Sequence, residues 1–161
     1  MNIEFSSAIQ KVHDLFTQKG LTLSVAESCT GGLISHYITS LPGASAFFKA
    51  GVVSYSIGTK KKLLGVPFEI ISEYGVVSAE TAKEMALRVR SLTGTDFGLS
   101  TTGNLGPDVL EGKERGLVYL AVSAGDLAVA RELRLRGERE ENKEMASLSA
   151  LRFLIEMVES S

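Results

Sequence analysis

The chain has 161 residues, with 17 Lys and Arg against 19 Asp and Glu, a formal net charge of −2, two His, one Cys and no Trp. This length fits one domain over residues 1–161 and excludes a second full domain. A single cysteine excludes an internal disulfide and a zinc site built from Cys clusters, and the near-neutral charge argues against a nucleic-acid partner.

The first residues lack the basic and apolar segments of a signal peptide, and no apolar run approaches the roughly 20 residues needed to cross a bilayer. We therefore expect a cytoplasmic protein with no membrane partner. The most highly charged segment, 131–144, balances five basic against five acidic residues, which is typical of a solvated surface.

Apolar residues at helical spacing predict an opening helix that ends at Lys19-Gly20 and buries Phe5, Ile9, Val12 and Phe16. The β-prone run 21–26 predicts a strand, and a helix is expected over about 33–39 after a glycine-rich turn. A second strand is predicted within 48–56, centred on 52–56, and one or two helical turns over 59–65. Residues 67–75 are interpreted as a loop with at most one short turn.

Ser78 is expected to cap a helix with an apolar face made of Ala82, Met85, Ala86, Val89 and Leu92. A third strand is predicted over 97–101, before a loop over 102–108. Strands over 116–124 and 127–136 are joined by a hairpin dipeptide at 125–126. A closing helix from about Glu138 is expected to bury Met145, Leu148, Leu151, Ile155 and Val158. This order of elements predicts a mixed sheet covered on both faces.

The strongest local signal for chemistry is the turn Ser28-Cys29-Thr30-Gly31-Gly32, between a predicted strand and a predicted helix. The N–H groups that begin a helix attract an anion or a developing oxyanion. A hydroxyl in this turn can attack a substrate, or it can simply cap the helix. Neither a P-loop nor a complete dinucleotide-binding motif is present.

A nucleophilic serine needs a base. His36 lies eight residues after Ser28, roughly 12 Å along a helix, and His13 belongs to the opening helix, so both histidines are interpreted as surface or packing residues. A lysine can act as the base when burial lowers its pKa. Lysines 60–62 follow the second strand, and these residues alone do not indicate which one acts. Tyr55 can relay a proton or pack at the rim of the sheet.

Several segments spread over nearly the whole chain share one pattern: Ala26-Glu27-Ser28-Cys29-Thr30-Gly31-Gly32, Gly43-Ala44-Ser45, Gly51-Val52-Val53-Ser54-Tyr55-Ser56 with Lys60, Gly65-Val66 and Gly75-Val76-Val77-Ser78. Together they closely resemble the CinA C-terminal family. This family comprises the C-terminal domain of the competence/damage-inducible protein and the stand-alone nicotinamide-nucleotide amidases.

The resemblance implies a three-layer α/β/α fold with a mixed, mainly parallel five-stranded sheet. It also implies hydrolysis of the carboxamide of nicotinamide mononucleotide to nicotinate mononucleotide and ammonia, with no metal and no cofactor. Ser28 matches the family nucleophile, Lys60 its general base and Tyr55 an assisting residue. N–H groups at the start of the following helix are expected to stabilise the oxyanion. Self-association in the family predicts a homo-oligomer.

Six further residues are expected to bind the substrate: Thr30, Gly31, Gly32, Gly103, Gly106 and Arg139. Of these, Arg139 is expected to contact the phosphate, since a guanidinium binds phosphate in a bidentate manner. The structural alternative is that Arg139 is an ordinary member of the charged surface segment.

Three positions depart from the family pattern. Ile57 replaces an asparagine before the lysine, the loop 103–110 loses its second pair of glycines, and Lys143 stands where an arginine is expected. Bulkier residues in the loop predict a reshaped or narrowed cavity. Two alternatives to the amidase therefore stay open: an amidase-like domain with an altered substrate, and a non-catalytic module that binds a ligand or another protein.

Overall fold

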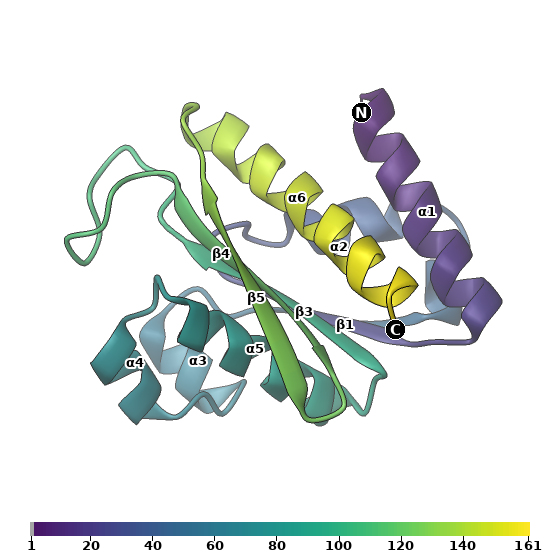
Figure 1. Ribbon diagram of the computed structural model, residues 1–161, viewed down its shortest axis with the longest axis horizontal. Coiled ribbons are helices and arrows are strands. Elements are labelled where there is room, and N and C mark those ends of the chain that lie inside the picture. Colours follow the sequence, from purple (N-terminus) through teal and green to yellow (C-terminus); the bar gives the residue numbers. More distant parts are fainter. Residues whose placement is uncertain (1) are drawn as a thin grey trace.

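A computed structural model describes residues 2–161 and contains one five-stranded sheet (Figure 1). Its order is β2 (Phe48–Val53), β1 (Leu23–Glu27), β3 (Phe97–Gly103), β4 (Leu117–Ala124) and β5 (Leu127–Arg134). The strand β1 pairs in parallel with β2 and β3, whereas β3–β4 and β4–β5 are antiparallel pairs. The sheet is therefore mixed, with its parallel part at the β2 side.

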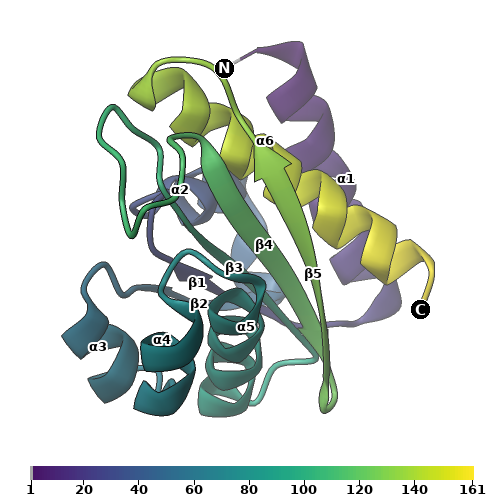
Figure 2. The ribbon, with the colours of Figure 1, turned by 60° about the vertical axis from the view of Figure 1, so that its left-hand side comes forward.

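Helices cover both faces of this sheet (Figures 1 and 2). One layer contains α1 (Ile3–Lys19), α2 (Leu33–Thr39) and α6 (Arg139–Glu159), and the other contains α3 (Ile57–Lys62), α4 (Phe68–Tyr74) and α5 (Ala79–Thr93). A short 3₁₀ turn over Ala44–Ala46 precedes β2. The largest apolar core lies between the sheet and the layer of α1, α2 and α6. These features confirm the predicted three-layer α/β/α class.

Local signals in the sequence account for most element ends. The opening helix ends at Gly20, whose left-handed φ of 64° closes the last turn. Ser78 accepts the Thr81 N–H as the cap of α5. Both predictions are confirmed, as are the hairpin between β4 and β5 and the boundaries of α2.

Other predicted boundaries are wrong for identifiable reasons. The strand β2 stops at Val53 because its partner β1 ends opposite it at Glu27. The strand β3 continues through Thr102 and Gly103 because β4 offers them pairing partners. Similarly, β5 ends at Arg134, where β4 begins.

Residues 67–75 form the two-turn helix α4 rather than a loop, and this prediction is wrong. Only Ile71 of this helix is buried, so no apolar stripe marks it in the sequence. Leu92 and Met145 were expected in the core but are 61% and 44% exposed, because the buried stripe of α5 ends at Val89 and α6 turns Ala146 inward instead.

The two connections that flank β2 in the chain run on opposite faces of the sheet. The connection from β1 to β2 contains α2 on one face, and the connection from β2 to β3 contains α3, α4 and α5 on the other. In open α/β sheets, ligands bind where such connections diverge, beyond the carboxyl ends of the strands. The residues that follow β1, β2 and β3 therefore meet at the expected place for a binding site.

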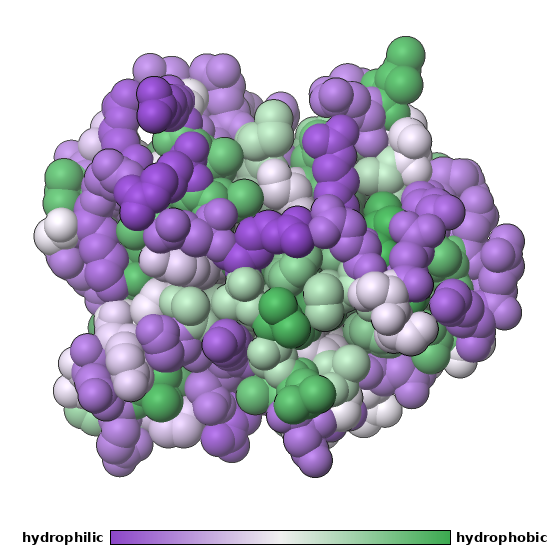
Figure 3. Space-filling view, viewed as in Figure 1, coloured by the Kyte–Doolittle hydropathy of each residue, from purple (hydrophilic) through white to green (hydrophobic). Residues whose placement is uncertain are grey.

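The opposite edge of the sheet is formed by β5, which carries exposed apolar residues including Leu127 and Val129. On the face of the molecule seen in Figure 3, apolar side chains gather over the middle, below a band of polar side chains. The predicted self-association stays a prediction. None of the helices within residues 2–161 is long and apolar enough to cross a bilayer.

Candidate active site

A buried carboxylate organises the turn that follows β1. Glu27 is fully buried, and its oxygens accept hydrogen bonds from the hydroxyls of Thr30 (2.6 Å) and Ser35 (2.7 Å). They also accept the backbone N–H groups of Gly32, Ile34 and Ser35 at 2.9–3.2 Å. The negative charge thus lies at the positive end of α2, where it is stabilised by the helix dipole.

This arrangement differs from the predicted oxyanion site. The N–H groups that begin α2 already donate to Glu27, and Leu33 donates to the Thr30 carbonyl. They are not available to a substrate. The sequence reasoning did not consider Glu27 as a functional residue, although an acidic residue ending an apolar strand just before a helix was a usable signal.

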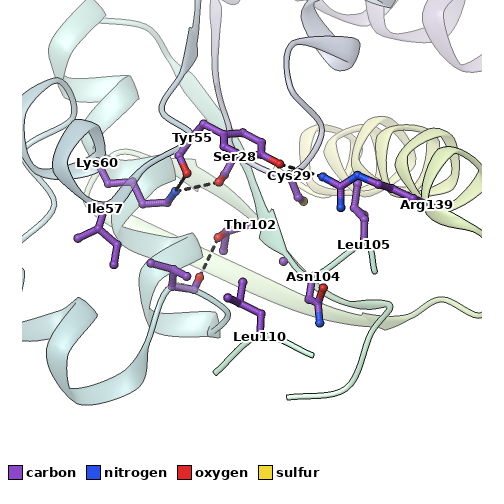
Figure 4. Close-up of a pocket in the computed structure, with 12 residues that line it drawn as sticks. Ser28, Cys29, Tyr55, Ile57, Lys60, Thr102, Asn104, Leu105, Leu110 and Arg139 are labelled. Carbon is purple, nitrogen blue, oxygen red and sulfur yellow. Dashed lines mark hydrogen bonds between the residues drawn. The ribbon is translucent and has the colours of Figure 1, made fainter. Parts of the chain in front are cut away.

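The side chains of Ser28 and Lys60 are in direct contact. Lys60 Nζ lies 2.8 Å from Ser28 Oγ, and it also donates to the carbonyls of Ser54 (2.8 Å) and Tyr55 (3.3 Å). Lys60 is only 1% exposed and Ser28 7%. Figure 4 shows the two side chains converging from the turn after β1 and from α3. A serine hydroxyl and a buried amine at this distance have the geometry that a nucleophile and its general base require.

Burial lowers the pKa of Lys60 to about 8, while the nearby Glu111 carboxylate acts in the opposite direction. A lysine with such a pKa is partly neutral near pH 7 to 8, as a general base must be. When it is neutral, Nζ can still donate to the Ser54 and Tyr55 carbonyls and direct its lone pair toward Ser28. The distance between Ser28 and Lys60 and the lowered pKa of Lys60 therefore both favour proton transfer from the serine to the lysine.

A short capped helix selects Lys60 from the three consecutive lysines. Ser56 and Thr59 cap the start of α3 reciprocally. The helix turns Lys60 into the protein and leaves Lys61 and Lys62 exposed. The sequence did not indicate which of the three lysines acts. The orientation of α3 about its axis buries Lys60 alone among them.

Tyr55 and Arg139 meet at the mouth of the site. Arg139 donates from one guanidinium nitrogen to the Tyr55 hydroxyl at 2.9 Å (Figure 4). Its other terminal nitrogen donates to the Gly106 carbonyl at 2.6 Å. The Tyr55 side chain is 59% exposed, so it lies at the rim rather than in the core. The Tyr55 hydroxyl contacts Arg139, whereas the Tyr55 backbone carbonyl is the part that contacts Lys60.

A cavity of about 260 Å³ opens beside the Ser28–Lys60 pair. Five of the predicted site residues line it: Ser28, Tyr55, Lys60, Gly103 and Arg139. The remaining wall consists of Cys29, Ile57, Val76, Thr102, Asn104, Leu105 and Leu110. Of these, Asn104, Leu105 and Leu110 belong to the loop 103–110 that was expected to reshape the cavity, whereas Val76 and Thr102 were not predicted, because only folding brings them to this edge of the sheet.

Four predicted substrate-binding residues do not line this cavity: Thr30, Gly31, Gly32 and Gly106. Thr30 is fully buried, and its hydroxyl bonds Glu27 and Thr101. Gly31 and Gly32 have φ angles of 60° and 102°, and they shape the turn. Thr30, Gly31 and Gly32 thus shape the turn beside the cavity and form none of its wall.

Cys29 adjoins the nucleophile but has a different character. Its thiol is buried, and burial raises its pKa to about 12. The thiolate is the reactive form of cysteine, so this side chain reacts slowly near neutral pH as long as it stays buried. His13 packs against Phe47 and lies 2.8 Å from the Ile38 carbonyl, while His36 is exposed. The interpretation of both histidines as packing or surface residues is confirmed.

A second cavity of about 380 Å³ adjoins the first through Arg139. It is lined by Leu33, Arg139, Glu140, Lys143 and Glu144. Lys143 also approaches the glycine turn, since a Cβ added at Gly31 would lie 3.4 Å from its ammonium nitrogen. Two cations thus stand next to the mouth of the Ser28–Lys60 cavity. No group of three or more His, Cys, Asp or Glu side chains in residues 2–161 is arranged to hold a metal ion.

These features define an α/β/α sandwich with a buried serine–lysine pair at the carboxyl edge of its sheet. Comparison with known proteins agrees: the sequence profile of the CinA C-terminal domain matches residues 6–158. The chain therefore belongs to the CinA C-terminal domain family.

Individual relatives support this membership. The chain is 44% identical to a CinA-like protein of Geotalea uraniireducens over 144 residues, covering 89% of this chain and 34% of that protein. A CinA-like protein of Dictyoglomus thermophilum is 44% identical over 150 residues, covering 92% of this chain and 36% of that protein. The chain thus spans about a third of the length of these curated relatives.

Solved structures share the fold over their full length. A CinA superfamily protein from Klebsiella pneumoniae superposes with a TM-score of 0.95 at 26% identity, covering 100% of both chains. The competence/damage inducible protein CihA from Agrobacterium tumefaciens gives a TM-score of 0.91 at 34% identity, covering 96% of each chain. The names of these proteins describe competence or damage induction and state no reaction.

Proposed function

We propose that this chain is a carboxamide hydrolase acting on nicotinamide mononucleotide, with Ser28 as nucleophile and Lys60 as general base. The observation that carries the proposal is the 2.8 Å contact between the Ser28 hydroxyl and the Lys60 amine, both buried at the wall of a cavity. The resemblance of the surrounding motifs to nicotinamide-nucleotide amidases supports the substrate.

The reaction follows from the positions of these two groups. Neutral Lys60 takes the Ser28 proton as Oγ attacks the carboxamide carbon, and the carbonyl electrons move to oxygen. Lys60 then gives that proton to the amide nitrogen, the C–N bond breaks, and ammonia leaves an ester on Ser28. A water molecule, deprotonated by Lys60, attacks the ester, and the returned proton restores the Ser28 hydroxyl and releases the carboxylate.

An oxyanion donor is available next to the nucleophile. Cys29 lines the cavity, and within residues 2–161 its backbone N–H donates to no other residue and contacts only its own thiol. We assign the stabilisation of the oxyanion to this group, in place of the N–H groups of α2 that Glu27 occupies. A preorganised backbone donor in a site shielded from water contributes more than the same group in water.

Two cations at the mouth of the cavity can bind the phosphate of a nucleotide. Arg139 lies between the two cavities, and Lys143 lines the second one together with Glu140 and Glu144. With the carboxamide at Ser28, a ribose phosphate extending past Arg139 reaches this pair of cations. Arginine binds phosphate through paired N–H donors and lysine as a point charge.

A second candidate is a serine–lysine amidase with another substrate. Ile57, Leu105 and Leu110 give the cavity an apolar side, and Ile57 and the loop around Leu110 are where the chain departs from the family pattern. Such a wall favours a less polar amide than that of a nucleotide.

The test is ammonia release by the purified protein from nicotinamide mononucleotide and from a panel of other carboxamides. We expect turnover of the mononucleotide with nicotinate mononucleotide as the organic product, and none by Ser28→Ala, which excludes a contaminating amidase. Preference for a different amide supports the second candidate. No turnover of any amide by the parent rejects both and indicates a binding module.

The activity should rise with pH. Since the active form of Lys60 is neutral and its pKa is about 8, kcat/KM should increase about tenfold per pH unit below pH 8 and level off above pH 9. At pH 6 we expect roughly a hundredth of the plateau value. Initial rates from pH 6 to pH 9.5 measure this dependence. A flat profile, or one that falls with pH, contradicts Lys60 as the base.

A further inference from the structure

The loop between β3 and β4 is fastened to the other side of the cavity by one side chain. The Glu111 carboxylate accepts the backbone N–H groups of Val76 and Val77, each at 3.0 Å. These residues lie between α4 and α5, 34 and 35 positions earlier in the chain. The loop projects beyond the end of the sheet (Figure 1), so this contact closes a gap between separate parts of the fold.

A second residue of the loop strengthens the contact. Lys113 donates to the carbonyls of Tyr74 and Val77, and its ammonium lies 3.7 Å from the Glu111 carboxylate. We refer to these contacts of Glu111 and Lys113 with residues 74–77 as the clasp. Within the loop, the Lys113 N–H donates to the Leu110 carbonyl, which fixes Leu110 next to the clasp.

The backbone on both sides is shaped for the clasp. Glu111 has a φ of 57°, a left-handed conformation that is unfavourable for residues other than glycine. On the other side, Gly75 has a φ of 83°, and a Cβ added there would lie 2.7 Å from the Glu111 carboxylate. Only a glycine at 75 leaves room for the carboxylate.

Both parts that the clasp joins line the main cavity. Val76 contributes one part of the wall, and Asn104, Leu105 and Leu110 contribute another. Thr102 connects them, because its hydroxyl donates to the Val76 carbonyl at 2.7 Å. Figure 4 shows Leu110 across Thr102 from the Ser28–Lys60 pair. Leu110 is 43% exposed, so packing alone does not hold it in place.

We propose that Glu111 is a positioning residue: through the clasp it holds Leu110 as a wall of the cavity opposite Ser28, and it thereby sets how tightly a substrate is held. This inference deepens the proposed amidase function, since it assigns control of substrate binding to a residue outside the catalytic pair. Glu111 touches no reacting atom in this scheme. Its removal should therefore weaken substrate binding and leave the chemical step in place.

Two measurements test the clasp without relying on turnover. In Glu111→Ala, the amide hydrogens of Val76 and Val77 should exchange at least tenfold faster, measured by NMR. Cys29 is the single cysteine and lines the cavity, so its alkylation by N-ethylmaleimide at fixed pH reports how far the cavity opens. We expect this rate to rise about tenfold in the variant as well.

The matched control is Glu114→Ala, which removes an acidic residue of the same loop that pairs with Arg134 and does not line the cavity. It should change neither rate. Gly75→Ala leaves Glu111 intact but places a methyl group where its carboxylate lies. It should therefore also speed both the amide exchange of Val76 and Val77 and the alkylation of Cys29. If it fails to fold, Glu111→Gln, which keeps one acceptor oxygen, should give intermediate rates.

Kinetics then connect the clasp to binding. For the amide that the parent turns over, Glu111→Ala should raise KM about tenfold and change kcat less than about twofold, both measured above pH 9, where Lys60 is neutral with or without the Glu111 carboxylate that raises its pKa. Unchanged exchange at Val76 and Val77, or unchanged alkylation of Cys29, overturns the clasp. Faster exchange with an unchanged KM overturns its role in binding. A parent without turnover rejects the proposed function alone, because the exchange and alkylation results still decide whether the clasp closes the cavity.

Discussion

Replacing Lys60 by methionine should lower kcat for the preferred carboxamide by about 10³- to 10⁴-fold. Methionine has a similar length but neither accepts the Ser28 proton nor returns it to the leaving nitrogen. The fold should persist, because the substitution removes a buried ammonium whose burial is unfavourable. Steady-state rates of ammonia release measure the loss, and circular dichroism verifies the fold.

The neighbouring lysine provides the control. Lys61 belongs to the same short helix but is exposed, so Lys61→Met should retain nearly full activity. A second variant, Lys60→Arg, keeps the positive charge and the N–H donors but cannot lose a proton in the working pH range. It should be as inactive as Lys60→Met. Substantial activity in either Lys60 variant would rule out the proposed base.

Replacing Glu27 by leucine should destabilise the fold by about 3 kcal/mol or more. The change removes the acceptor of five hydrogen bonds and leaves the donors of Thr30, Gly32, Ile34 and Ser35 without it. A loss of this size corresponds to a fall in Tm of roughly 10 °C for a domain of this length. Thermal and urea unfolding of the parent and the variant measure it.

Two further variants separate charge from shape at this position. Glu27→Gln keeps the shape and one acceptor oxygen, so its loss of stability should be smaller than that of the leucine variant. Glu69→Gln makes the same change at an exposed position in the first turn of α4 and should have almost no effect. Equal stability of Glu27→Leu and the parent would mean that the carboxylate does not hold the turn.

The fold was largely predictable because its signals are local. The helices α1 and α5 each bury one face, and apolar residues at helical spacing predict that face. A glycine marks the end of α1, and a serine marks the start of α5. The errors arise where the deciding contact is distant in sequence. The strand β2 ends where β1 stops, and α4 has a single buried residue, so neither feature leaves a periodic pattern in its own segment.

The site was predictable only in part for the same reason. The resemblance named Ser28, Tyr55 and Lys60, and the structure brings Ser28 and Lys60 into contact. The clasp of Glu111 and Lys113 with residues 74–77 joins segments 34 to 39 positions apart, and no spacing rule connects them. The role of Glu27 was not predicted, because most of its partners are backbone N–H groups. Every residue except proline has such a group, so the sequence does not show which ones a carboxylate will bind.

The last helix also determines when the site is complete during synthesis. The nucleophile and the base lie within the first 60 residues, whereas Arg139 and Asn142 belong to α6. Asn142 donates to the Leu105 carbonyl, and Arg139 to that of Gly106, so α6 holds the start of the loop that lines the cavity. While α6 is still inside the ribosome, Ser28 and Lys60 can be in place but the cavity beside them lacks these contacts, so the cavity is completed only after α6 has been synthesised.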